Sequence, residues 1–464
     1  MRRRAAGALV AVIALVAACG SRVDSDETVI SGGGGSAEGE AGAEGGAEGG
    51  EAAATTIGDL ETPCGEGDAA GATDTGVTDD AIQVGTITDE GNEVTPGLNV
   101  QMRQGMEAFA AYCNELGGIN GRELEVVPLD AALFDYDAVV REACDSVLAL
   151  VGGGGALDAG GAQTGVDCGL PDVAAFAVSP QKTDADLVWQ PLPNPSGRIN
   201  LGSSQWVAEE FPDAAESAGI VFSDIDVTRI QADRLIEGLE ASGFEVTEEV
   251  PAQIMERNWT PIVLDLQDVG VEYITMVSEP GEFTNMQNEM VTQGFEPEVV
   301  ELEANFYDQS YLGTAGETAL GNLVRITIWP FEEADQNPAT QFYVDMLEQH
   351  GEDGAEPALL GVQALSAGLL FATAASACGA ELTRACLETE LDGITEWTGG
   401  GLHGPTNPAE AGPSPCFIVM EVVEGGDAGV QFERRFPDED FDCADDNVIE
   451  LEGDFGEGAT AGGG

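Results

Sequence analysis

The stretch from residue 81 to residue 130 constrains the fold more than any other part of the sequence. Residues 81–87 (AIQVGTI) alternate in the manner of a buried strand, and a polar loop follows them. Apolar side chains then recur at steps of three and four over residues 98–116, which predicts a helix that packs one apolar stripe against a sheet. Two glycines end this helix, and residues 123–130 are predicted as a second strand. Strand, helix and strand in this order predict a βαβ crossover, which joins parallel strands.

Strands and helices keep alternating beyond this unit. Residues 147–151 and 173–178 are predicted as the next two strands, with helices between them. A proline-rich segment, residues 189–197, then interrupts the alternation and indicates a crossing into a second lobe. There the pattern restarts, with strands expected at residues 220–222, 245–250, 273–277, 298–303, 323–329 and 416–423, the last in a hairpin with residues 430–435. The alternation predicts an α/β protein with doubly wound, mostly parallel sheets.

Both ends of the chain have compositions that differ from the middle. Three arginines precede an apolar run at residues 5–18 that is short for a membrane span, so residues 1–18 are predicted as a signal peptide. The small residues before Cys19 resemble a bacterial lipobox. We therefore expect Cys19 to carry a lipid that anchors the exported protein to the outer face of the cell membrane; the alternative is an ordinary signal peptide with a cysteine nearby. Residues 19–75 are predicted as a disordered Gly/Ala/Glu linker, and residues 441–464 as an acidic, glycine-rich tail.

The cysteine count predicts disulfides. Nine cysteines without Cys19 leave eight, an even number in an exported chain, which is typical of a framework of up to four disulfides. The sequence leaves roughly a hundred connectivities open. Local reasoning favours the pairs Cys64–Cys113, Cys144–Cys168, Cys378–Cys386 and Cys416–Cys443. With no Cys-x-x-Cys motif and two histidines, we expect no metal site, and no cofactor motif occurs.

The charge balance narrows the possible partners. The chain has 85 acidic and 16 basic residues, a formal net charge of −69. Nucleic acid and anionic membrane surfaces are therefore poor partners, and we interpret the charge as an adaptation to salt or to an acidic proteome. The sequence contains no Gly-x-Ser-x-Gly and no His-Glu-x-x-His motif, so the chain is not predicted to be an enzyme.

One motif carries a family resemblance. The run Gly-Gly-Ile-Asn-Gly-Arg, residues 117–122, follows a strand that begins the domain, a polar loop and a helix. This arrangement resembles the opening of the leucine/isoleucine/valine-type periplasmic binding proteins. The resemblance implies a type I fold of two lobes, each a doubly wound, mostly parallel sheet, joined by a three-segment hinge. The implied lobes are residues 76–197 plus 330–413 and residues 198–329 plus 414–440.

In an open parallel sheet, ligands lie beyond the carboxyl ends of the strands, so the loops after the strands hold the candidate binding residues. The loop after residues 147–151 begins with four glycines, which allow backbone N–H groups to approach a small anion; a flexible turn is the alternative. In the next loop, the resemblance implies that Thr183 supplies a hydroxyl to a ligand carboxylate. Lys182, the only lysine in the chain, is a candidate for anion contact or a solvated loop charge. The candidates in the first lobe are Gly154, Gly155, Ala156, Leu157, Ser179, Lys182 and Thr183.

The second lobe would close over the ligand. The resemblance places residues 224–227, 279–283 and 305–308 at the cleft. The sequence departs here from the amino-acid-binding members, which use tyrosines in the first two loops and a glutamate for the ligand ammonium in the third. Phe283 and Tyr307 are candidate aromatic walls, and the candidate acids are Asp226, Glu279 and Asp308. For each of them, a packing or solvated role is the alternative.

These observations lead to one interpretation with two alternatives. We predict an extracytoplasmic solute-binding protein that captures a small polar metabolite, such as an amino acid, an amide or a related carboxylate. It would deliver this ligand to the permease subunits of an ABC importer by hinge closure, as a monomer. The alternatives are a ligand-sensing receptor subunit of the same fold and a secreted enzyme that uses the cleft between the lobes.

Overall fold

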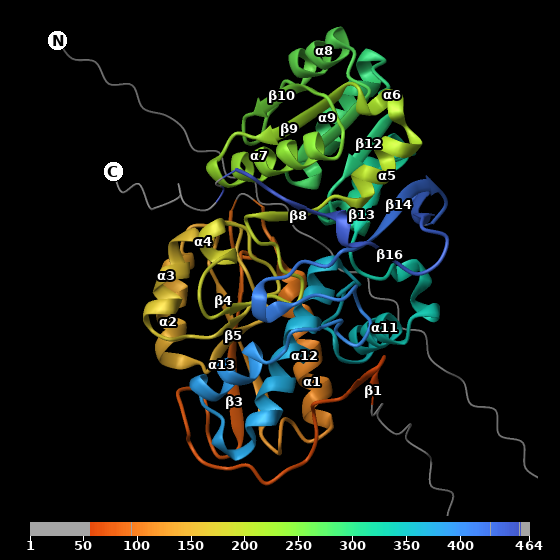
Figure 1. Ribbon diagram of the computed structural model, residues 1–464. Helices are drawn as coiled ribbons and strands as arrows, with labels where there is room; N and C mark the ends of the chain where they lie inside the picture. Colours follow the sequence, from red (N-terminus) through yellow and green to blue (C-terminus); the bar gives the residue numbers. More distant parts are fainter. Residues whose placement is uncertain (1–55, 94, 427, 454, 456–464) are drawn as a thin grey trace, which may run out of the picture. The chain divides into compact units, whose positions relative to one another are not determined.

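The computed structural model describes residues 56–93, 95–426, 428–453 and 455 (Figure 1). The predicted signal peptide, Cys19 and the first part of the predicted linker lie outside the described residues. The two predicted lobes correspond to two groups of elements, each built around its own sheet.

The first lobe contains a five-stranded parallel sheet in the order β4-β3-β5-β6-β7. Its strands are β3 (Ala81–Thr88), β4 (Glu123–Asp130), β5 (Ala149–Val151), β6 (Asp172–Val173) and β7 (Val188–Trp189). Its helices are α1 (Val100–Glu115), α2 (Tyr136–Ser146), α3 (Ala159–Asp167), α4 (Pro180–Thr183), α11 (Pro338–His350), α12 (Leu359–Cys378) and α13 (Arg384–Asp392). The predicted βαβ unit is therefore confirmed as β3, α1 and β4.

Helix α12 forms the centre of the first lobe's core. It consists almost entirely of Ala, Leu, Gly and Ser, and it lies beside α1 (Figure 1). The two helices approach so closely that a Cβ atom at Gly105 would lie 2.9 Å from the carbonyl oxygen of Gly361. Within the described part of the chain, this helix is the one candidate whose length and hydropathy suit a membrane span, but 72% of its apolar window is buried in the protein. The burial identifies a core helix.

The second lobe contains the strand order β10-β9-β11-β12-β13-β14-β15, and β16 also pairs with β14. The parallel strands are β9 (Ala218–Ser223), β10 (Val246–Ala252), β11 (Tyr273–Val277), β12 (Val299–Leu302) and β13 (Leu323–Ile326); the antiparallel ones are β14 (Cys416–Glu424), β15 (Val430–Phe436) and β16 (Asp442–Cys443). The helices are α5 (Gly202–Glu210), α6 (Pro212–Ala215), α7 (Asp226–Ala241), α8 (Thr260–Val269), α9 (Pro280–Gln293) and α10 (Gln309–Ala315). The predicted hairpin after residue 416 is confirmed as β14 and β15.

The chain passes three times between the lobes, as predicted. It leaves the first sheet after β7 and enters the second lobe through β8 (Arg198–Asn200), returns after β13, and crosses again into β14. The first crossing is tied to the second lobe by Arg234 of α7, whose buried guanidinium donates hydrogen bonds to the carbonyl oxygens of Pro195 (2.6 Å), Ser196 (3.0 Å) and Arg198 (2.9 Å). This side chain therefore fixes the start of the second lobe against the hinge.

The structure corrects the bounds of both terminal segments. Residues 56–75, predicted as linker, include the antiparallel strands β1 (Thr56–Ile57) and β2 (Leu60–Glu61) and the disulfide of Cys64 with Cys113. Residues 441–453, predicted as tail, include β16 and β17 (Val448–Glu450), and β17 pairs with the hinge strand β8. Both segments combine a disulfide and backbone pairing with a few apolar side chains: Ile57 is fully buried in the core of the first lobe, and Phe441 and Ile449 pack against buried clusters.

The four disulfides join the pairs that local reasoning favoured, namely Cys64–Cys113, Cys144–Cys168, Cys378–Cys386 and Cys416–Cys443. Cys144 lies in the last turn of α2 and Cys168 directly follows α3, two helices that pack side by side on the first sheet. The prediction succeeded here because helices of successive crossovers can share one face of a parallel sheet.

The Gly-Gly-Ile-Asn-Gly-Arg motif has a structural role. Gly117, Gly118, Asn120 and Gly121 all have positive φ, at 105°, 76°, 53° and 88°. A Cβ atom at Gly118 would lie 2.0 Å from the carbonyl oxygen of Arg122, so this position requires glycine. The turn buries Arg122 completely, and its guanidinium donates to three carbonyl oxygens in two segments distant in sequence, the one before β3 and the end of α12.

Candidate functional site

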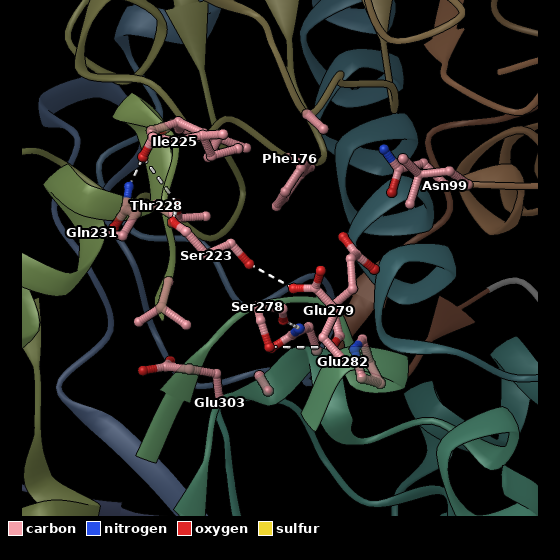
Figure 2. Close-up of a pocket in the computed structure, with 18 of the residues that line it drawn as sticks. Asn99, Phe176, Ser223, Ile225, Thr228, Gln231, Ser278, Glu279, Glu282 and Glu303 are labelled. Carbon is pink, nitrogen blue, oxygen red and sulfur yellow. Dashed lines mark hydrogen bonds between the residues drawn. The ribbon is translucent and has the colours of Figure 1, made fainter. Parts of the chain in front are cut away.

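A cleft lies between the two lobes, lined by loops at the carboxyl ends of strands from both sheets (Figure 2). Its volume is 2670 Å³. Pockets that enclose a small molecule measure roughly 300–1,000 Å³. The volume of the cleft is therefore larger than a small ligand fills, which indicates an open arrangement of the lobes.

Two buried aspartates hold the first-lobe wall in place. Asp89, directly after β3, accepts hydrogen bonds from the backbone N–H of Leu133 (2.8 Å) and of Ala156 (2.8 Å). Asp158, directly before α3, accepts from the N–H of Val178 (2.8 Å) and of Ser179 (3.0 Å). Burial raises the pKa of Asp158, and these hydrogen bonds oppose that rise. The two carboxylates therefore fix the positions of the loops that form the first-lobe wall.

The glycine-rich loop does not present its amides to the cleft as predicted. The N–H of Gly152 donates to the carbonyl oxygen of Val173 and that of Gly154 to Ile87, both at 2.9 Å. A Cβ atom at Gly153 would lie 2.4 Å from the nitrogen of Ile87, so the glycines permit close packing on β3. Gly154 and Gly155 do not line the cleft, whereas Ala156 and Leu157 do.

The structure also corrects the expectations for Lys182 and Thr183. Both side chains are buried in or beside α4 and neither lines the cleft. The ammonium of Lys182 forms an ion pair with Asp172 and lies 5.7 Å from the ring centroid of Tyr136. Desolvation lowers the pKa of Lys182, but the charge of Asp172 outweighs this effect and raises it. The hydroxyl of Thr183 donates back to the carbonyl of Pro180. Of the candidates in this loop, Ser179 lines the cleft.

The second-lobe wall is acidic and well ordered around Glu282. Its carboxylate accepts hydrogen bonds from the hydroxyl of Ser223 and from the N–H of Met255, both at 2.6 Å, so it joins the loops after β9 and β10 (Figure 2). Glu279, at the start of α9, lies beside it and has no partner for its side chain among the described residues. The cleft walls desolvate Glu279, and together with the charge of Glu282 they raise its pKa.

The other second-lobe candidates have different positions. Asp226 begins α7 and is exposed to the cleft. Tyr307 lines the cleft but is nearly buried, with its hydroxyl bonded to Glu332 and its ring stacked on Phe331. Asp308 also lines the cleft and caps α10 by accepting from the N–H of Ser310 (2.6 Å). Phe283 is fully buried in the core, so its predicted place in the ligand wall is corrected.

The structure adds cleft residues that the sequence analysis missed. Asn99 and Phe176 face the cleft from the first lobe, and Arg257 lines it from the second. Gln231 of α7 donates a hydrogen bond to the carbonyl oxygen of Val178 (2.8 Å), which joins the two walls near the hinge. Phe176 lies within the segment predicted as a strand and Asn99 within the predicted helix, so the sequence carried no signal for either; Arg257 follows the strand predicted at residues 245–250, and its position was the available signal.

Comparisons with known proteins agree with this geometry. The family model described as periplasmic binding protein matches residues 81–427. Among solved structures, a fatty acid ABC transporter substrate-binding protein from Thermomonospora curvata has a TM-score of 0.68 at 17% identity, covering 85% of this chain and 98% of that chain. A leucine binding protein from Thermotoga maritima has a TM-score of 0.62 at 16% identity, covering 76% and 98%. A solute binding protein from R. palustris in complex with 4-hydroxybenzoate has a TM-score of 0.63 at 16% identity, covering 77% and 96%. No curated protein sequence matches the chain.

Proposed function

The chain belongs to the periplasmic binding protein family, and from this premise we propose that it captures a small polar metabolite outside the cytoplasm and delivers it to an ABC importer by closing its two lobes. The observation that carries the proposal is the open cleft of 2670 Å³, which has walls from both sheets and a hinge of three crossings. A ligand that contacts both walls favours the closed form by its differential affinity for that form.

The charges of the cleft support a ligand with an ammonium group. Ten acidic residues and four arginines line it. Most of these acids already have partners; for example, Glu303 pairs with Arg325 and Glu289 accepts from Thr260. Glu279 has none and lies against the cleft. An amino acid fits this wall better than a simple carboxylate does, because its ammonium is a natural partner for Glu279.

Replacing Glu279 with glutamine tests this assignment. With the standard L-amino acids as probes in thermal-shift and calorimetric titrations, we expect at least one to bind the mature protein and 4-hydroxybenzoate not to bind. Glu279→Gln should lower the affinity for that amino acid by about ten- to hundredfold, which corresponds to the loss of one hydrogen bond to a charged group. Binding should also weaken as pH falls through the raised pKa of Glu279, since the protonated form loses the ionic contact.

Glu289→Gln is the matched control, since Glu289 also lines the cleft but is bonded to Thr260 and Gln293. It should leave the affinity nearly unchanged. Equal affinity in the wild type and Glu279→Gln would show that the ammonium lies elsewhere.

No specific observation favours a reaction in the cleft. The pair that most resembles a nucleophile and its base is Ser366 with His403, whose Oγ and Nε2 atoms are 2.9 Å apart. Both residues are buried in the first lobe, and desolvation lowers the pKa of His403 to about 4. The pair has a structural role: the hydroxyl of Ser366 also accepts a hydrogen bond from the Nε1 atom of Trp397.

Delivery to an importer requires the protein to stay near the membrane. We propose that a lipid on Cys19, which lies outside the described residues, provides this anchor for a monomeric binding protein. A sensing role for the same fold would use the same cleft and the same closure.

A further inference from the structure

Arg257 differs from every other described basic residue. The chain contains 16 lysines and arginines, and four of them precede residue 56, outside the described part. Of the twelve described, eleven have an ion pair or a hydrogen bond to a carbonyl oxygen. Arg257 has neither, and it is exposed in the wall of the cleft. In a chain with 85 acidic residues, an arginine with neither a carboxylate nor a carbonyl acceptor is unexpected.

Two acidic residues that hold this loop, Glu256 and Glu282, already have other partners. The carboxylate of Glu256 accepts hydrogen bonds from the backbone N–H of Arg257 and of Asn258, both at 2.8 Å. Glu282 holds the N–H of Met255 and thereby fastens the loop of residues 253–259 to the start of α9. The backbone of this loop is therefore fixed, while the guanidinium of Arg257 is left without an acceptor.

A second donor without an acceptor lies two residues further on. Trp259 lines the cleft and is 5% exposed, and its Nε1 atom is buried with no hydrogen-bond partner among the described residues. Buried N–H groups are nearly always paired in folded proteins. The Trp259 nitrogen is not accessible from the cleft, so the guanidinium of Arg257 is the donor of this loop that a ligand can reach.

We infer that Arg257 binds a carboxylate of the ligand. The inference rests on the proposed function and deepens it by naming the ligand class: a metabolite that carries a carboxylate, with its ammonium at Glu279. The planar guanidinium presents parallel N–H donors that match the two oxygens of a carboxylate. Both charged contacts then come from the second lobe, whereas the sequence analysis assigned the carboxylate to Lys182 and Thr183 of the first lobe.

Paired probes test the inference on the mature full-length protein. Each standard L-amino acid is compared with its own carboxamide, which keeps the ammonium and the side chain but lacks the negative charge. We expect the acid to bind at least about tenfold more tightly than the amide. Arg257→Gln should lower the affinity for the acid by about ten- to hundredfold and leave the affinity for the amide unchanged. Arg257→Lys should recover only part of the lost affinity. Inorganic phosphate should not compete, since a carboxylate is the expected partner.

Arg229→Gln is the control of equal charge, because Arg229 also lines the cleft but pairs with Asp224. It should leave both affinities nearly unchanged. The inference is overturned if Arg257→Gln binds the acid as tightly as the wild type does, or if the wild type binds acid and amide equally. In either case the proposed function stands. Competition by phosphate overturns the carboxylate assignment. Failure of every amino acid and amide to bind contradicts the assignment of an amino acid as the ligand, on which both Glu279 and Arg257 depend.

Discussion

Replacing Lys182 with alanine is expected to lower the free energy of unfolding by about 3–5 kcal/mol, the usual cost of removing one partner from a buried ion pair. The ammonium of Lys182 and the carboxylate of Asp172 are almost fully excluded from solvent, with side-chain exposures of 4% and 7%. Without Lys182, the charge of Asp172 would stay buried with no counter-charge at the start of β6. Urea denaturation with a two-state fit measures the loss as a lower midpoint.

The double variant Lys182→Met with Asp172→Leu distinguishes this cause from simple loss of packing. It removes both charges and keeps apolar volume, and such replacements are often neutral or stabilising. We expect it to recover most of the loss. A single variant as stable as the wild type would show that Lys182 is a solvated loop charge after all, as the alternative interpretation of the sequence had it.

Replacing Arg122 with methionine is expected to destabilise the protein by at least about 3 kcal/mol, because three hydrogen bonds from a buried charged donor are lost and a hydrogen bond to a charged group contributes about 1.5–3 kcal/mol. The guanidinium donates to the carbonyl oxygens of Thr78 (3.1 Å), Gly71 (3.1 Å) and Gly379 (3.4 Å). These three groups belong to the segment before β3 and to the end of α12, so Arg122 holds the ends of the first lobe together. Thermal and urea unfolding measure the effect.

Arg141→Met serves as the control. Arg141 is 66% exposed and pairs with Asp137 one turn earlier on α2. Exposed pairs of this kind contribute about 0.3–0.5 kcal/mol, so this variant should unfold close to the wild type. Similar losses in both variants would mean that Arg122 acts through its general charge and not through its three carbonyl partners.

The sequence predicted the fold well because the signal for fold is local and periodic. The alternation of residues 81–87, the apolar stripe of the following helix and the turn after it were enough to place β3, α1 and β4. Disulfides between successive crossovers followed from the same topology. The ordered terminal segments were missed because their few buried apolar residues, such as Ile57 and Ile449, form no periodic pattern, and backbone pairing such as that of β17 with β8 cannot be seen in the sequence.

The site was predicted less well, since it depends on partners distant in sequence. The loops after the strands were identified correctly, and Ala156, Ser179 and Glu279 do line the cleft. Within a loop, however, the side chains available to a ligand are those that form no ion pair or hydrogen bond with another residue of the protein. Asp172 engages Lys182, and the glycine-rich loop packs on Ile87, whereas Arg257 lacks a partner. Scarcity of basic residues singled out Lys182, which is paired with Asp172 away from the cleft, whereas Arg257 lines the cleft.

The proposed function requires the cleft to close around a ligand, and the distance between a position on each lobe measures this closure directly. Phe134 of the first lobe and Ile254 of the second line the cleft and are 75% and 52% exposed, so spin labels at these positions should be tolerated. The distance is measured by pulsed electron spin resonance, without ligand and with the L-amino acid that binds in calorimetry. We expect a broad, long distance in the free protein and a shorter, narrower one when that amino acid is bound. A distance that stays unchanged at saturating ligand would contradict capture by lobe closure.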